Sequence, residues 1–385
     1  MKNSTLTGSA QNSEDRTALN PDEAWMKRAL ELAKQGWPLT SPNPMVGAVI
    51  VKDGRLIGEG WHQKAGGLHA EREALKNCSE SAKGADLYVT LEPCCHTGKQ
   101  PPCTEAILEA GIKRVFVGSL DPNPLVSGKG IQILRDHGIE VASGILEEEC
   151  CQLNRHFFHY ITRKKPWVTM KFAMTLDGKT ALETGESKWI TSEEARRHVH
   201  QTRHENMAIM AGIGTVLADD PMLDCRIENG RNPLRVICDT HLRTPMNSKL
   251  VQSAREIPVI LAAGKSAAGR MESYLQAGCQ VWLFDELDGK VDLDQLMNRL
   301  AENHIDTVLL EGGSTLNQAM LKAGLVSHIQ AYIAPKIFGG HGPSPVGGME
   351  VRAVDEALRL GSLSFHQIGP DILIEGDLIS ETEDW

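Results

Sequence analysis

Hydrophobic residues in the first third of the chain alternate between helix-like repeats and short strand-like runs. Trp25, Ala29 and Leu32 recur at helical spacing after Asn20-Pro21, a pair that favours a helix start. Apolar runs bounded by turn residues predict strands over 48–51, 56–61, 86–91, 114–117 and 139–141. Helices are expected over 69–77, from near Cys94 or Cys103 to Gly111, and over 131–137. This order predicts a central sheet covered by helices.

A second alternation of the same kind begins after residue 166. Strands are expected over 168–174, 208–211, 234–238, 258–262, 307–310, 328–333 and 371–375, and helices over 192–203, 293–303 and 316–323. We therefore predict an α/β protein with domains over 21–145 and 167–385. The segment 146–166, charged and at first helical, is expected to be the linker, and the polar residues 1–20 a disordered tail.

Composition and charge narrow the class of protein. The 385 residues agree with two domains, because a single core rarely exceeds about 250–300 residues. No stretch approaches the roughly 20 apolar residues of a membrane span. The cysteine count of 9 is odd and the spacing irregular, which favours the reducing cytoplasm over a disulfide framework. The net charge of −10 argues against nucleic acid as a partner and leaves small phosphorylated metabolites open.

The first domain carries a set of possible zinc ligands. His69, Cys94 and Cys103 supply the three protein ligands that a catalytic zinc site usually has, and water takes the fourth position. Glu71 would then take a proton from that water and pass it to a ring nitrogen and a leaving amine, as in the zinc deaminases. The alternatives are buried thiols beside a surface histidine, or a structural zinc site in which Cys95 or His96 is the fourth ligand.

Eight residues separate Cys94 from Cys103, whereas two are usual in deaminases of this pattern. Further distinctive phrases are Pro42-Asn43-Pro44-Met45-Val46-Gly47, Gly60-Trp61-His62, His69-Ala70-Glu71, Glu92-Pro93-Cys94, Pro101-Pro102-Cys103, Asp121-Pro122-Asn123-Pro124, Leu176-Asp177-Gly178, Gly185-Glu186-Ser187-Lys188-Trp189-Ile190-Thr191, Gly214-Thr215-Val216-Leu217-Ala218-Asp219-Asp220-Pro221 and Glu311-Gly312-Gly313. With this gap and these phrases, the chain resembles the bifunctional deaminase/reductase family of riboflavin biosynthesis. That family usually has arginine at the position of Lys99.

The resemblance implies two consecutive reactions on phosphorylated pyrimidines. A three-layer domain of the cytidine-deaminase fold would bind Zn2+ and hydrolyse the C2 amino group of 2,5-diamino-6-(5-phosphoribosylamino)pyrimidin-4(3H)-one, releasing ammonia. A second α/β domain of the dihydrofolate-reductase fold would use NADPH to reduce the ribosyl group to ribityl. Asn43 is a candidate substrate contact, or only a turn residue; His62 and Lys64 are further candidates. The family also implies a homo-oligomer, a dimer or larger.

Two turns of the second domain, 211–215 and 310–315, place glycines after strands and before helices. Such turns bring backbone N–H groups to a phosphate, although glycines also serve tight turns alone. NADPH is implied by the resemblance. It assigns cofactor contacts to Ala173, Trp189, Thr215, Asp219, Thr240, Gly313, Ser314, Thr315, Leu316, Asn317, Gln318 and Ala319. It assigns substrate contacts to Ser187, Arg203, Leu223, Arg226 and Glu311.

Three basic residues of the second domain have a chemical reason to meet the substrate. Lys171 lies within an apolar strand, where a cation is costly unless paired, so we expect it beside the sugar or phosphate. Arg203 and Arg226 suit a phosphate through bidentate contacts, and a surface salt bridge is the alternative. Trp189 is a core residue in the alternative interpretation.

Two rival functions are open: a tRNA or nucleotide deaminase with an unrelated second domain, and a zinc protein without catalytic activity.

Overall fold

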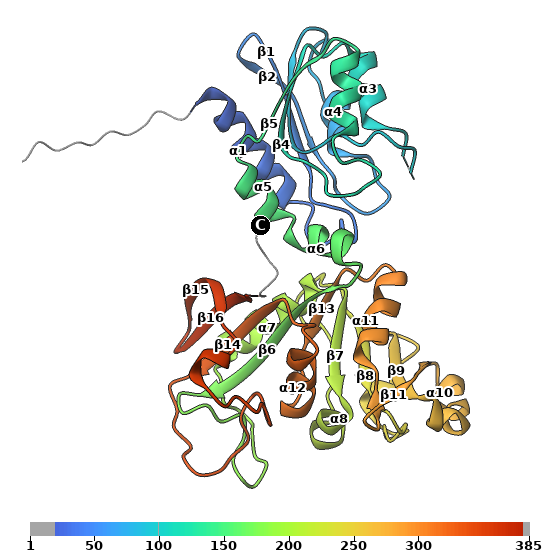
Figure 1. Cartoon of the computed structure of the whole chain (residues 1–385), viewed down its shortest axis with the longest axis vertical. Coiled ribbons are helices and arrows are strands. Elements are labelled where there is room, and N and C mark those ends of the chain that lie inside the picture. The colour runs from blue at the N-terminus through green and yellow to red at the C-terminus, as the bar shows by residue number, and fades with distance from the viewer. Residues whose placement is uncertain (1–19, 99, 380–385) are drawn as a thin grey trace, which may run out of the picture.

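The computed structural model describes residues 20–98 and 100–379, which form two α/β domains stacked along the long axis of the molecule (Figure 1). The tail predicted over residues 1–20 lies outside the described residues except for Asn20, and so does Lys99. Within the described part of the chain, every helix is too short or too polar to span a membrane. The mixed α/β fold class predicted from the sequence is confirmed.

The first domain is built on a five-stranded sheet in the order β2-β1-β3-β4-β5. Strand β1 is antiparallel to β2 and β3, and the remaining pairs are parallel. Asp53 and Gly54 both have positive φ, which closes the tight β1–β2 hairpin. The strands are β1 (Gly47–Lys52), β2 (Arg55–Trp61), β3 (Asp86–Leu91), β4 (Arg114–Ser119) and β5 (Glu140–Ser143).

Alternation along the strands gives the first domain three layers. Val49 and Val51 of β1 pack on one side, in the cluster that holds α1. Ala48 and Ile50 pack on the other side, in the cluster that includes residues of α2, α3 and α4. The Asn20 side chain accepts a hydrogen bond from the first turn of α1, as a helix cap does. These helices are α1 (Pro21–Lys34), α2 (Ala70–Lys76), α3 (Cys103–Ala110) and α4 (Lys129–Asp136).

Two helices occupy most of the segment predicted to be the linker. Helix α5 (Glu147–Leu153) packs against the first domain through the buried Cys150, which lies in the same cluster as α1. Helix α6 (Arg155–Arg163) lies between the domains and leads into the first strand of the second domain (Figure 1). Asn154 is the junction between the two helices.

The second domain has a nine-stranded sheet in the order β10-β9-β8-β7-β13-β6-β14-β16-β15. The seven strands from β10 to β14 in this order are parallel, β16 is antiparallel to β14, and β15 is antiparallel to β16. A separate small hairpin joins β11 (Glu286–Leu287) to β12 (Lys290–Val291). The sheet strands are β6 (Trp167–Thr175), β7 (Ala208–Gly212), β8 (Leu234–Cys238), β9 (Val259–Gly264), β10 (Gln280–Phe284), β13 (Thr307–Leu310), β14 (His328–Ala334), β15 (Leu360–Ile368) and β16 (Asp371–Leu378).

Helices cover both faces of this sheet. Met210 of β7 packs on the face covered by α11 (Leu293–Glu302) and α12 (Ser314–Lys322). Its neighbour Ile209 packs on the opposite face, with α8 (Ile213–Asp219), α9 (Lys249–Gln252) and α10 (Glu272–Ala277). Helix α7 (Glu193–Glu205) covers β14 and β16. The turns after the parallel strands β7, β13 and β6 therefore meet at one edge of the sheet.

Candidate active sites

His69, Cys94 and Cys103 form one cluster in the first domain. His69 Nδ1 lies 3.4 Å from Cys94 Sγ and 3.3 Å from Cys103 Sγ, and the three ligand atoms are within 4.8 Å of one another. Tetrahedral zinc with ordinary bond lengths would set each N–S separation at about 3.6 Å. The donor set therefore fits zinc. Among residues 20–98 and 100–379, no other group of His, Cys, Asp or Glu side chains has this spacing.

Local structure brings these ligands together. His69 immediately precedes α2, so Glu71 falls in the first turn of that helix and is only 3% exposed. Cys94 follows β3, and Cys103 is the first residue of α3. The backbone N–H of Cys103 donates to Cys94 Sγ at 3.4 Å, and such a donor favours a thiolate. The eight residues between the cysteines thus form the connection from the strand to the helix.

Contacts within the cluster shift the pKa values of its cysteines and of Glu71. The Cys103 thiol and His69 hydrogen-bond to Cys94 and lower the pKa of Cys94 to about 4, while the same contact raises the pKa of Cys103. Burial, together with the charge on Cys94, raises the pKa of Glu71 to about 7. A carboxyl group with this pKa both accepts and donates protons near neutral pH.

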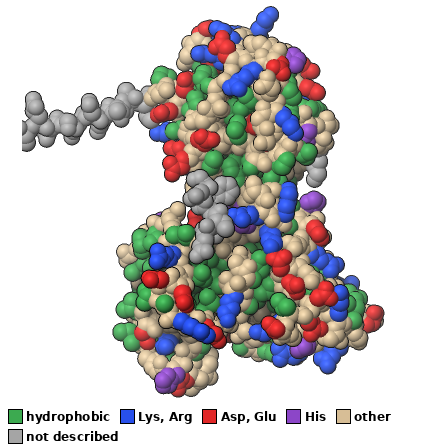
Figure 2. Space-filling view, viewed as in Figure 1, with side chains coloured by type: hydrophobic (Ala, Val, Ile, Leu, Met, Phe, Trp, Pro, Cys, Tyr) green, Lys and Arg blue, Asp and Glu red, His purple; other side chains and the backbone are tan. Residues whose placement is uncertain are grey.

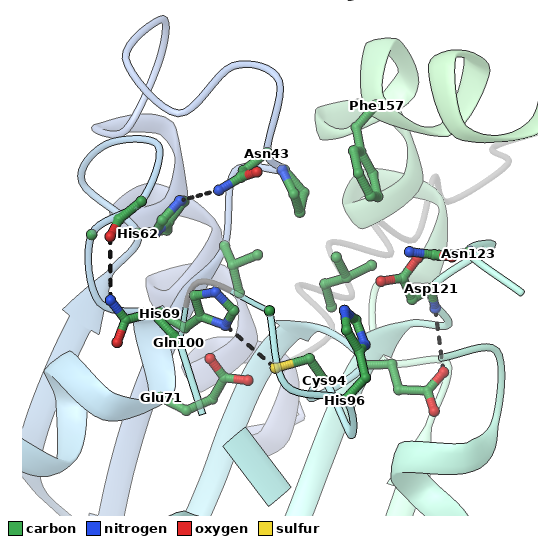
Figure 3. A pocket seen from close by; sticks show the side chains of 17 residues that line it. Asn43, His62, His69, Glu71, Cys94, His96, Gln100, Asp121, Asn123 and Phe157 are labelled. Carbon is green, nitrogen blue, oxygen red and sulfur yellow. Dashed lines mark hydrogen bonds between the residues drawn. The ribbon is translucent and has the colours of Figure 1, made fainter. Parts of the chain in front are cut away.

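The cluster lies at the base of a cavity of about 270 Å³ (Figure 3). His62 Nδ1 lies 2.9 Å from the carbonyl oxygen of Leu68, so this nitrogen carries the proton. Burial lowers the pKa of His62 and keeps the ring neutral, which makes Nε2 an acceptor. The Asn43 amide nitrogen donates to that atom at 3.1 Å. Asn43 lines the cavity, and within residues 20–98 and 100–379 no group donates a hydrogen bond to its amide oxygen.

The opposite wall of the cavity carries Asp121, Asn123 and His96 (Figure 3). Burial raises the pKa of Asp121 to about 6, and its carboxylate accepts from the backbone N–H of Asn123 at 2.8 Å. Cys95 donates to a backbone carbonyl at 3.7 Å, and neither Cys95 nor His96 belongs to the ligand cluster. Three protein ligands with space above them are typical of a catalytic zinc site rather than a structural one.

Two glycine-containing turns of the second domain lie side by side at the carboxyl edge of its sheet. One follows β7 and the other follows β13, and these strands are neighbours. Among the described residues, a β-carbon added at Gly214 would meet no atom within 4 Å, and one at Gly313 would meet only the Thr215 hydroxyl, at 3.7 Å. Asn317 Oδ1 is buried and has no hydrogen-bond partner in the part of the chain that the structure describes. Open space beside backbone N–H groups and an unpaired polar atom fit a nicotinamide dinucleotide.

Lys171, Arg203 and Glu311 meet from β6, α7 and the turn after β13, and their side chains are 13–14% exposed. Arg203 donates from Nε and Nη2 to the two oxygens of Glu311 at 2.7 and 3.0 Å, and Lys171 Nζ lies 3.8 Å from Glu311 Oε2. Burial alone would raise the pKa of Glu311, but the charges of Arg203 and Lys171 lower it to about 2. Two cations thus share one carboxylate, and the remaining positive charge suits an anionic group.

Other predicted contacts of the second domain are distributed around this edge. Trp189 is 62% exposed, with the Arg196 guanidinium 4.3 Å from its ring centroid, so it is not a core residue. Asp219 ends α8 and pairs with Lys188 at 3.4 Å. Arg226 is exposed and pairs with a neighbouring carboxylate at 3.0 Å, outside the Lys171–Glu311 group.

Further members of the predicted set have backbone or structural contacts. The Thr240 hydroxyl accepts from a backbone N–H at 3.2 Å. Leu223 is buried, with φ of 52°. Ala173 and Ser187 are half-buried, in β6 and in the loop before α7. Residues 313–319 form the start and first turns of α12. The contacts of these residues with cofactor or substrate stay predictions.

Two sequence profiles together match most of the chain. The profile of the cytidine and deoxycytidylate deaminase zinc-binding region matches residues 19–119. The profile of the RibD C-terminal domain matches residues 166–374, which is more than half of the chain. The riboflavin biosynthesis protein RibD of Actinobacillus pleuropneumoniae is 50% identical over 360 residues, covering 93% of this chain and 96% of the relative. The chain belongs to the RibD family.

Other family members are similar to this chain in sequence and structure over nearly its whole length. The RibD protein of Escherichia coli strain K12 is 39% identical over 92% of this chain and 98% of its own. A Thermotoga maritima structure, described as a diaminohydroxyphosphoribosylaminopyrimidine deaminase/5-amino-6-(5-phosphoribosylamino)uracil reductase, is 39% identical. It superposes with a TM-score of 0.82, covering 93% of this chain and 99% of its own. Acinetobacter baumannii RibD gives 0.84 at 39% identity, with coverage of 94% and 99%. The domain order deaminase, then reductase, is thereby confirmed.

Two features near the deaminase cavity were not predicted from the sequence. Phe157 of α6 lines the cavity, although it follows Cys103 by more than fifty residues (Figure 3). Asn154, at the start of the same helix, is 2% exposed and bonds to the loop that carries Asn43. No local motif marks either residue, because their role depends on how the linker folds back.

Proposed function

We propose that the chain catalyses two consecutive steps of riboflavin biosynthesis. The domain over 21–145 deaminates 2,5-diamino-6-(5-phosphoribosylamino)pyrimidin-4(3H)-one. The domain over 167–385 then reduces the ribosyl group of 5-amino-6-(5-phosphoribosylamino)uracil to ribityl. The observation that carries this proposal is the buried Glu71 beside a three-ligand cluster in a cavity large enough for a pyrimidine. Family membership supports the order and the substrates.

In the first reaction, His69, Cys94 and Cys103 hold Zn2+, which supplies a Lewis acid that makes water a stronger nucleophile near neutral pH. Glu71 accepts a proton from a water molecule while the oxygen of that water attacks C2 of the pyrimidine. Glu71 passes this proton to the ring nitrogen, then takes the proton of the new C2 hydroxyl and gives it to the amine; the C2–N bond breaks, and the products are a C2 carbonyl and ammonia. The free amide oxygen of Asn43 accepts a hydrogen bond from the pyrimidine and orients it.

In the second reaction, the C1′–O4′ bond of the ribosyl group breaks, C1′ gains a hydride and O4′ gains a proton, which gives the open-chain ribityl group; bound NADPH would supply the hydride. We assign cofactor binding to the turns after β7 and β13 and to the first turns of α12, where the glycines leave open space. Lys171, held by Glu311, contacts the sugar or phosphate of the substrate. Arg203 uses three donors on Glu311 and on the carbonyl of Asp224, so its main effect is to fix the position of Glu311.

We also propose that the chain forms a homo-oligomer and acts in the cytoplasm, and the exposed surface supports the first of these assignments. The edge hairpin β15–β16 exposes large apolar side chains, and hydrophobic atoms gather over this part of the surface (Figure 2). Leu363, Phe365 and Ile372 are each 47–64% exposed there. An apolar edge of this kind is typical of a surface that pairs with another chain. Sedimentation analysis tests this assignment: the wild type is expected to be a dimer or larger, and Phe365→Asp to dissociate it.

A coupled assay tests the proposed function. Purified zinc-loaded protein is mixed with the diaminopyrimidine phosphate, and ammonia is measured before and after NADPH is added. We expect one ammonia per substrate without NADPH, followed by stoichiometric NADPH oxidation. Ammonia release from dCMP or tRNA but not from the diaminopyrimidine phosphate would contradict the first assignment. Failure to oxidise NADPH after complete deamination would contradict the second.

A further inference from the structure

Helix α6, outside the matched zinc-binding region, contributes a wall to the deaminase cavity. That region ends at residue 119, whereas Phe157 lines the cavity. In Figure 3, Phe157 lies across the cavity from Glu71 and Cys94, between the side that carries Asn43 and the side that carries Asn123. Phe157 is only 8% exposed, so most of its side chain is withdrawn from solvent. A planar pyrimidine held at the cluster would thus face an aromatic surface.

Asn154 ties the same helix to the loop that carries Asn43. Its amide oxygen accepts from the Met45 N–H at 2.8 Å, and its amide nitrogen donates to the Met45 carbonyl at 2.9 Å. Both hydrogen-bonding groups of one backbone residue are thus satisfied by one buried side chain. Met45 lies two residues after Asn43. The position of the Asn43 amide therefore depends on a residue of the linker.

The rest of α6 is bound to the reductase domain. Arg155 pairs with Asp377 at 3.3 Å, and its guanidinium lies 5.1 Å from the ring centroid of Trp167. The Tyr160 hydroxyl donates to the carbonyl of Ala301 at 3.0 Å. These contacts involve β16, β6 and α11, so the helix that contributes a wall to the deaminase cavity is also held by contacts with the second domain.

From this arrangement we propose that Phe157 and Asn154 determine substrate binding in the deaminase site. Phe157 contacts the substrate on the side away from the metal, and Asn154 is a positioning residue that acts through the Asn43 loop. This inference rests on the proposed function. It also implies that deamination requires the second domain as a structural partner, in addition to its own reaction.

The test compares steady-state deamination by the full-length protein and its variants, with zinc content and reductase activity measured in parallel. We expect Phe157→Ala to raise the KM for the diaminopyrimidine phosphate about tenfold, with kcat changed by less than about twofold, because the lost contact serves binding. Phe157→Tyr, which keeps the ring, should restore the KM. Phe158→Ala removes the neighbouring ring, which does not line the cavity, and should behave as the wild type. In all variants, zinc content and reduction of the supplied uracil phosphate should be unchanged.

Asn154→Ala is a second, independent variant, expected to raise the KM about tenfold with zinc retained. A KM within twofold of the wild type for both Phe157→Ala and Asn154→Ala would overturn the inference while leaving the proposed function intact. A rise in KM accompanied by loss of zinc, or matched by Phe158→Ala, would also overturn it, since general damage would then explain the effect. Absence of ammonia release by the wild type would instead refute the proposed function, and this inference with it.

Discussion

Glu71 and Glu311 are carboxylates withdrawn from solvent, one in each domain, yet their pKa values move in opposite directions. Burial and the thiolate of Cys94 raise the pKa of Glu71 to about 7. Burial acts on Glu311 too, but Arg203 and Lys171 outweigh it and lower the pKa to about 2. The neighbouring charges therefore decide whether a buried carboxyl group carries protons or remains a fixed anion. The first behaviour suits hydrolysis, and the second suits the positioning of cations around a substrate.

The largest effect on activity is expected when Glu71, the residue that carries protons in the deaminase site, is replaced. Glu71→Gln keeps the size and polarity of the side chain but cannot move protons, so deamination should fall by at least about 10³-fold. Zinc content should be unchanged, because Glu71 is not in the ligand cluster. Glu73→Gln, on the same helix but outside the cavity lining, is the matched control and should retain activity. Unaltered ammonia release by Glu71→Gln would remove this residue from the mechanism.

A smaller effect is expected from neutralising the fixed anion. Glu311→Gln leaves Lys171 and Arg203 without their carboxylate, and a misplaced cation near the substrate can cost about 10²-fold in rate. NADPH oxidation with the supplied uracil phosphate should fall by about this factor, and ammonia release should not change. The exposed Glu256→Gln is the control. If reduction survived Glu311→Gln within twofold, the charged group would have only a structural role.

The smallest effect is expected on the stability of the protein at acid pH, through Glu311. The folded pKa of Glu311 is lowered, so its contribution is present above about pH 4.5 and is lost as the pH falls toward 2. Glu311→Gln should therefore lower the free energy of unfolding at pH 7 by about 3 kcal/mol, and the gap to the wild type should shrink below pH 4.5. Urea unfolding at a series of pH values measures this gap. A gap that stays constant down to pH 2.5 would contradict the assigned ion pairs.

The two sites also differ in how far the sequence could predict them. His69, Glu71, Cys94 and Cys103 were identified from their chemistry and order, because each lies at the start of a helix or the end of a strand that the hydrophobic pattern predicts. Lys171 was identified as a cation within an apolar strand, and the family resemblance assigned Arg203 and Glu311 to the substrate. Their grouping around one carboxylate was not predicted, since three separate elements supply them. Phe157 and Asn154 were missed, because their position depends on packing between the domains.

The sequence also predicted some elements of the fold and missed others. Buried strands such as β3, β8 and β13 were predicted with their observed bounds, because each is a short, mostly apolar run in which most positions are buried. The edge strand β15 was not predicted: Leu363 and Phe365 are exposed, so the strand lacks a buried face from which a pattern could be read. The segment 146–166 was expected to be helical only at first, whereas α6 continues to Arg163 and packs against both domains.

The most direct test of two separate sites acting in a fixed order is NADPH oxidation by Glu71→Gln with each substrate in turn. With 5-amino-6-(5-phosphoribosylamino)uracil, we predict oxidation at the wild-type rate, because the Glu311 site is intact. With the diaminopyrimidine phosphate, we predict no oxidation beyond background, because no deaminated product forms. Oxidation with both substrates would contradict the order of the reactions, and oxidation with neither would contradict the independence of the two sites.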